Sequence, residues 1–126
     1  MKDPVLLVAL PLITAFLLPV LARISLLAGR WIGPLSLLAT SVLGLSLMAA
    51  LDGEPQAVAL GGFRAPLGIT LYLDPLALLF TLAVSIGCLL LWPRYSDSNL
   101  RERTLTLVLA AAGNGLALSG DLFNMY

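Results

Sequence analysis

The chain has 126 residues, of which 60% are hydrophobic and 11% are charged. Soluble domains average roughly 45–50% apolar and about 25% charged residues, so this composition excludes an ordinary soluble domain. Seven basic and seven acidic residues leave no net charge, which argues against a nucleic-acid partner. The chain has no histidine and one cysteine, Cys88, which excludes histidine-based catalysis and an intrachain disulfide. We therefore expect no metal site and no bound cofactor.

Four long stretches of the chain contain no charged residue. They cover residues 4–22, 31–51, 75–93 and 104–120. A hydrocarbon core about 30 Å thick is crossed by roughly 20 residues of helix, and these stretches lack the polar face of a soluble helix. We predict an all-α membrane protein, a single membrane segment with transmembrane helices at about 4–22, 31–51, 74–93 and 104–120.

The first stretch is too long for the apolar region of a signal peptide, which has about 7–15 residues. Asp3 also stands where a signal peptide carries positive charge, and no small-x-small cleavage site precedes Arg23. We therefore expect a retained helix. Pro11, Pro19 and Pro34 lie in or near the first two spans, and membrane helices tolerate such prolines when neighbouring groups satisfy the freed carbonyls.

The segment between the second and third spans, residues 52–73, is too long for a tight turn. Residues 57–60 and 69–73 favour strands, and Gly61, Gly62 and Pro66 lie between them. Gly61 and Gly62 fit a turn or a bend within a strand. We predict a small extracytoplasmic hairpin here, with a plain interfacial loop as the alternative.

The basic residues predict the orientation of the chain in the cell membrane. The first and third loops together carry five arginines, whereas the other side carries only Lys2 and Arg64; the five are Arg23, Arg30, Arg94, Arg101 and Arg103. Cytoplasmic loops of membrane proteins carry the excess of Lys and Arg. We therefore expect a multi-pass protein with both termini and the second loop outside.

Three polar residues near the third and fourth spans are candidates for an ion path. Asp74 precedes Pro75, which is typical of a helix N-cap followed by proline; an ion-attracting carboxylate is the alternative. Asn114 lies mid-span between glycines, of which Gly115 permits close approach of a neighbouring helix, and we expect the amide to bond that helix. Gly120 ends the fourth span, and Asp121 follows it as a cap or as a third ion-path candidate.

Two parts of the chain resemble a known family. Residues 61–69 and 73–80 are similar to the second loop and third helix of antiporter-like membrane subunits, and residues 114–115 and 119–126 to the end of their fourth helix. The family comprises the D subunit of Mrp-type sodium/proton antiporters and the proton-pumping subunits of respiratory complex I (NADH:quinone oxidoreductase) and of membrane-bound hydrogenases. The string Gly-Asp-Leu-Phe-Asn-Met-Tyr favours the Mrp and hydrogenase types.

The resemblance implies that this chain corresponds to the first four of about fourteen helices. Family members handle ions with a glutamate on the fifth helix and lysines on later helices, so the resemblance carries no catalytic residue into this chain. It implies an N-terminal fragment or split piece of a subunit that acts with other subunits and is inactive alone. A sodium ion or a proton would be the family substrate, and a role within an NADH:quinone oxidoreductase-like enzyme stays open.

Two other functions also fit a short membrane protein. A self-contained four-helix transporter would need a carboxylate inside the membrane, and the first span has none. A non-catalytic scaffold subunit would pack partner helices against small residues, which residues 110–115 and 44–50 provide.

Overall fold

The computed structural model describes residues 3–52, 54–59, 70–92 and 100–119. Four helices make up most of these residues: α1 (Leu6–Ile24), α2 (Leu26–Ala50), α3 (Pro75–Leu90) and α4 (Leu100–Leu118). Two short strands, β1 (Gln56–Ala59) and β2 (Thr70–Leu73), lie between α2 and α3. The chain is therefore mostly helical, in agreement with the predicted fold class.

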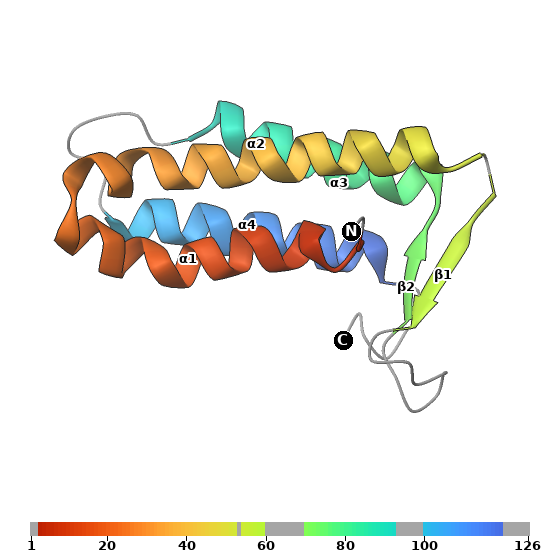
Figure 1. The fold of residues 1–126 in the computed structure, drawn as a ribbon, viewed down its shortest axis with the longest axis horizontal. Helices are drawn as coiled ribbons and strands as arrows, with labels where there is room; N and C mark the ends of the chain where they lie inside the picture. Colours follow the sequence, from red (N-terminus) through yellow and green to blue (C-terminus); the bar gives the residue numbers. More distant parts are fainter. Residues whose placement is uncertain (1–2, 53, 60–69, 93–99, 120–126) are drawn as a thin grey trace.

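The four helices form an up-and-down bundle (Figure 1). Each helix packs against the next one in the chain, and α4 closes the bundle by packing against α1. The turn between α1 and α2 lies at one end of the bundle, and the paired strands lie at the other (Figure 1). Every helix therefore has two helical neighbours and one outward face.

The strands form an antiparallel pair in the register Gln56 with Leu73 and Ala59 with Thr70. The side chains of β2 alternate as a half-buried strand requires: Leu71 and Leu73 are buried, whereas Tyr72 is exposed. A bridge between Leu71 and Ser119 joins β2 to the residue after α4. The pair lies where β-prone runs were predicted, whereas Gly61 and Gly62 lie outside the described residues.

The turn between α1 and α2 is only one residue long. Ser25 adopts extended backbone angles (φ −149°, ψ 123°) and accepts a long 3.5 Å bond from the Ala28 amide. A Cβ atom on Gly29 would lie 2.8 Å from the Cα of Ala22, so glycine permits this close approach. The second helix begins at Leu26 rather than at residue 31, because Arg30 ends the uncharged stretch without ending the helix.

The other helix ends also depart from the uncharged stretches. Asp74 caps α3 with Pro75 at the first helical position, but α3 ends at Leu90 and not at residue 93. The fourth helix starts at Leu100 and not at 104, because the charged residues 101–103 are good helix formers. Charged residues thus bound the apolar core of a helix, whereas capping residues mark the ends of the helix itself.

Two apolar clusters fill the bundle. One lies near the strands and includes Leu7, Leu47, Leu78 and Leu118. The other lies towards the α1–α2 turn, where the Trp92 ring packs so closely on Gly33 that a Cβ there would lie 2.1 Å from a ring carbon. The outward helix faces are apolar as well, with Phe16, for example, 73% exposed.

The length and composition of α1 and α2 suit them to cross a membrane. The third helix is apolar but has 16 residues, and α4 carries charges in its first turn. A bundle that is apolar both inside and outside is typical of a protein surrounded by lipid.

Candidate functional site

A buried amide joins three helices. The side chain of Asn114 on α4 is fully buried, and its Nδ2 group donates to the Leu7 carbonyl of α1 at 2.9 Å. The same nitrogen donates to the Ser85 hydroxyl of α3 at 3.2 Å. Ser85 Oγ also lies 3.5 Å from Asn114 Oδ1. We call these three residues the Asn114 junction.

A proline explains why the Leu7 carbonyl is free to accept this bond. In a regular helix the carbonyl of Leu7 would accept from the amide of residue 11, but Pro11 has no amide hydrogen. A buried carbonyl without a donor is costly in a membrane, where no water replaces the bond. The Asn114 amide supplies the donor that Pro11 removes. The general rule for prolines in membrane helices says that a neighbouring group satisfies the freed carbonyl, but not which residue does so.

The Asn114 junction lies in a polar layer between the two apolar clusters. On each helix, one or two buried polar residues fall between a member of one cluster and a member of the other. These residues are Thr14 on α1, Thr40 and Ser41 on α2, Thr81 and Ser85 on α3, and Asn114 on α4. The layer crosses all four helices, and on α4 Asn114 stands four residues before the last helical residue, Leu118.

Most hydroxyls of the layer bond within their own helix. Thr40 donates to the Ser36 carbonyl at 2.8 Å, and Thr81 donates to the Ala77 carbonyl at 2.9 Å. Such bonds satisfy the hydroxyl without linking helices. Ser85 and Asn114 differ, because their bonds cross between helices.

The glycines that flank Asn114 have different surroundings. A Cβ on Gly113 would lie 2.9 Å from Cγ1 of Val84, whereas a Cβ on Gly115 would meet Val8 at an ordinary 3.8 Å. Close approach of α3 to α4 therefore depends on Gly113. Gly115, at which the sequence pattern predicted a close helix approach, has room for a methyl group.

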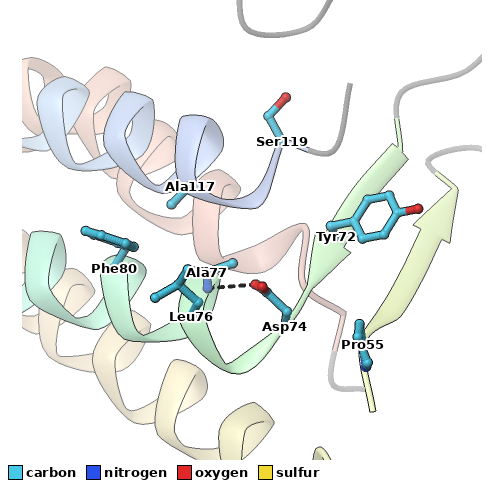
Figure 2. Close-up of a pocket in the computed structure, with 8 residues that line it drawn as sticks. All are labelled: Pro55, Tyr72, Asp74, Leu76, Ala77, Phe80, Ala117 and Ser119. Atoms are coloured by element: carbon cyan, nitrogen blue, oxygen red, sulfur yellow. Dashed lines mark hydrogen bonds between the residues drawn. The ribbon is translucent and has the colours of Figure 1, made fainter. Parts of the chain in front are cut away.

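Asp74 lies at a second polar position, in a pocket of about 440 Å³ at the strand end of the bundle. Its Oδ1 accepts the Ala77 amide at 2.7 Å, as an N-cap does (Figure 2). Leu76 and Phe80 give the pocket an apolar wall, and Tyr72 and Ser119 lie towards the strands (Figure 2). Asp74 and Asn114 are thus in separate environments.

Two other residues singled out from the sequence, Gly120 and Asp121, lie outside the described residues. Among the residues that the structure does describe, no charged side chain is buried. The same residues contain no group of three His, Cys, Asp or Glu side chains that could hold a metal ion. The buried polar side chains of the described residues are therefore hydroxyls and one amide, beside the thiol of Cys88.

Comparison with known proteins shows what this chain is similar to. No protein-family model matches the chain. In an alignment 125 residues long that covers 94% of the chain, it is 32% identical to the D subunit of the Na⁺/H⁺ antiporter of Bacillus subtilis (strain 168), of which it covers 25%. Its fold matches a chain of the membrane-bound sulfane sulfur reductase, an archaeal respiratory membrane complex, with a TM-score of 0.84 and 28% identity. That match covers 99% of this chain and 27% of the other.

These similarities confirm the resemblance that the sequence motifs indicated. The chain is homologous to part of the D subunit of a sodium/proton antiporter, and it has the fold of part of a membrane-complex subunit. It spans about a quarter of the length of both relatives.

Proposed function

We propose, from the homology of the chain to a quarter of the D subunit of a sodium/proton antiporter, that it supplies the first four transmembrane helices of an antiporter-like, cation- or proton-translocating subunit. It works within a multi-subunit complex of the cell membrane, by packing around a translocation path whose ionisable groups lie on other helices. The chain is inactive in transport on its own.

The packing of the bundle supports four membrane crossings. The fourth helix packs against α1 and α3, so it crosses the membrane if they do. Its charged residues are confined to its first turn, and the uncharged stretch 104–120 follows them. Uncharged residues likewise continue past the end of α3, through residue 93, which gives a run long enough for a hydrocarbon core.

The separation of charge along the bundle supports the orientation. Among described residues, the strand end carries only acidic charges, namely Asp3, Asp52, Glu54 and Asp74. The α1–α2 end carries four arginines against one glutamate; these residues are Arg23, Arg30, Arg101, Glu102 and Arg103. Because basic residues favour the cytoplasmic side, the strand pair and both termini face outside.

The lack of a buried charge in the described residues, taken with the homology, is the observation that carries the inactive-alone proposal. A carrier of protons or sodium ions needs an ionisable group within the membrane. The Asn114 amide does not titrate, and Asp74 lies at a helix end. The described helices thus offer a scaffold and no coupling group.

Reconstitution tests the proposal. The purified chain is placed in liposomes loaded with a pH-sensitive dye, and a sodium or pH gradient is imposed. We expect the rate of dye response to equal that of empty liposomes, while liposomes with a complete antiporter respond. Sodium/proton exchange well above the empty-liposome rate would refute the proposal and favour a self-contained transporter.

A further inference from the structure

The turn between α1 and α2 exposes basic and apolar side chains together. Its aliphatic residues are largely exposed: Ile24 at 75%, Leu26 at 89% and Leu27 at 72%. Two exposed arginines flank them, and the exposed Trp31 follows. We call the six residues Arg23, Ile24, Leu26, Leu27, Arg30 and Trp31 the basic turn. Leucine and isoleucine side chains at this exposure call for an apolar or interfacial environment.

The backbone holds the two arginines at the same end of the bundle. Only Ser25 is non-helical between α1 and α2, and Ala22 lies against Gly29 at the contact that excludes a Cβ. Arg23 and Arg30 each follow one member of this contact pair in the sequence. The two guanidinium groups therefore start from neighbouring backbone positions on rigid helices.

The length of α2 gives the depth of the basic turn. Its 25 residues span about 37 Å, some 7 Å more than a hydrocarbon core of about 30 Å. The uncharged residues 31–51 match the core, so the excess lies in residues 26–30. A headgroup layer is about 5–7 Å thick. The basic turn therefore lies at the level of the lipid phosphates.

We propose that the basic turn binds an anionic phospholipid, with Arg23 and Arg30 on the headgroup phosphate and Trp31 at the boundary with the acyl chains. The proposal rests on the membrane-spanning arrangement of the proposed function. Guanidinium groups match phosphate oxygens through paired hydrogen bonds, and tryptophan favours the membrane interface. Lipid is favoured over a protein partner, because the turn ends within the headgroup layer, where its basic side chains meet phosphate groups.

Trp31 provides a direct readout. The chain is reconstituted in phosphatidylcholine bilayers that contain either brominated phosphatidylglycerol or brominated phosphatidylcholine at the same mole fraction, and tryptophan quenching is measured. We expect stronger quenching by the anionic lipid. Each arginine near an anionic surface raises relative binding by about fivefold. A Trp31→Phe variant gives the background from Trp92, which is buried.

Variants locate the site. Arg23→Gln with Arg30→Gln removes most of the preference for the anionic lipid, because only Arg101 and Arg103 remain among the described arginines at this end, whereas Arg23→Lys with Arg30→Lys keeps most of it. Glu54→Gln, which changes a charge at the opposite end of the bundle, is the control for position and leaves the preference unchanged. Circular dichroism verifies that each variant keeps its helices.

Three outcomes would overturn the proposal. The first is equal quenching of the wild-type chain by both lipids; protection of Trp31 only when partner subunits are present would then assign the turn to a protein. The second is an anionic preference of the same size in the double glutamine variant as in the wild-type chain. The third is no quenching of Trp31 by either lipid, which would also count against the membrane-spanning arrangement; the first two would leave that arrangement standing.

Discussion

Replacing Asn114 with alanine tests the junction between α1, α3 and α4. In the wild-type chain the amide donates to the Leu7 carbonyl at 2.9 Å and to Ser85 at 3.2 Å. Removing it leaves a buried carbonyl that Pro11 deprives of its helical donor. We expect Asn114→Ala to lower the free energy of unfolding by about 2 kcal/mol, from the cost of one unsatisfied carbonyl and a lost interhelical bond.

A Pro11→Ala background separates the carbonyl from other effects. Alanine at position 11 restores the amide hydrogen that a regular helix directs at the Leu7 carbonyl, so this carbonyl again has a donor on its own helix. In this background, Asn114→Ala should cost about 1 kcal/mol less than in the wild-type chain. The difference is the coupling energy of a double-mutant cycle between the two positions.

Unfolding in mixed micelles by added SDS, followed by far-UV circular dichroism, supplies the four free energies. Thr40→Val is the matched control, because Thr40 is fully buried in the same layer but bonds only its own helix. Removing the Thr40 hydroxyl should lower the free energy of unfolding by about 0.5 kcal/mol or less. Equal costs for Asn114→Ala and Thr40→Val, or an additive cycle, would refute the role assigned to Pro11 and Asn114.

Further substitutions test packing and capping. Gly33→Ala should lower the free energy of unfolding by about 1–3 kcal/mol, because its Cβ overlaps the Trp92 ring. Gly87→Ala should not destabilise the chain, because its Cβ meets no atom within 4 Å. Unfolding by SDS compares the two variants, and equal effects would contradict the packing. Asp74→Ala should cost about 1 kcal/mol through the lost cap on the Ala77 amide, and Asp74→Asn should cost little. In a complete complex, a transport defect in Asp74→Asn with normal stability would assign the carboxylate to an ion path instead.

The sequence predicts the number and rough position of the helices, because membrane spans exclude charge regardless of how they pack. The helix ends are harder to predict. Arg30, for example, lies within α2, because a charged residue can continue a helix beyond its apolar core. Asp74 and Pro75 marked the start of α3 well, because a cap acts through its own local backbone. Local signals thus predict local features.

The partners of Asn114 could not be predicted, because they depend on which helices become neighbours. A bond between residues 7 and 114 spans nearly the whole chain. Pro11 did contain a usable signal, since it identifies Leu7 as a carbonyl that needs an outside donor. Nothing in the sequence says that Asn114, rather than Thr81 or Thr40, supplies it.

The central claim, four membrane crossings with the strand pair outside, is tested most directly by cysteine accessibility in intact cells. In a Cys88→Ala background, single cysteines replace Ser25, Gln56, Arg101 and Ser119, and a membrane-impermeant maleimide is added from outside. We predict labelling at positions 56 and 119 in intact cells, and at positions 25 and 101 only after permeabilisation. Labelling of positions 56 and 101 from the same side would show that α3 does not cross the membrane and would contradict the account.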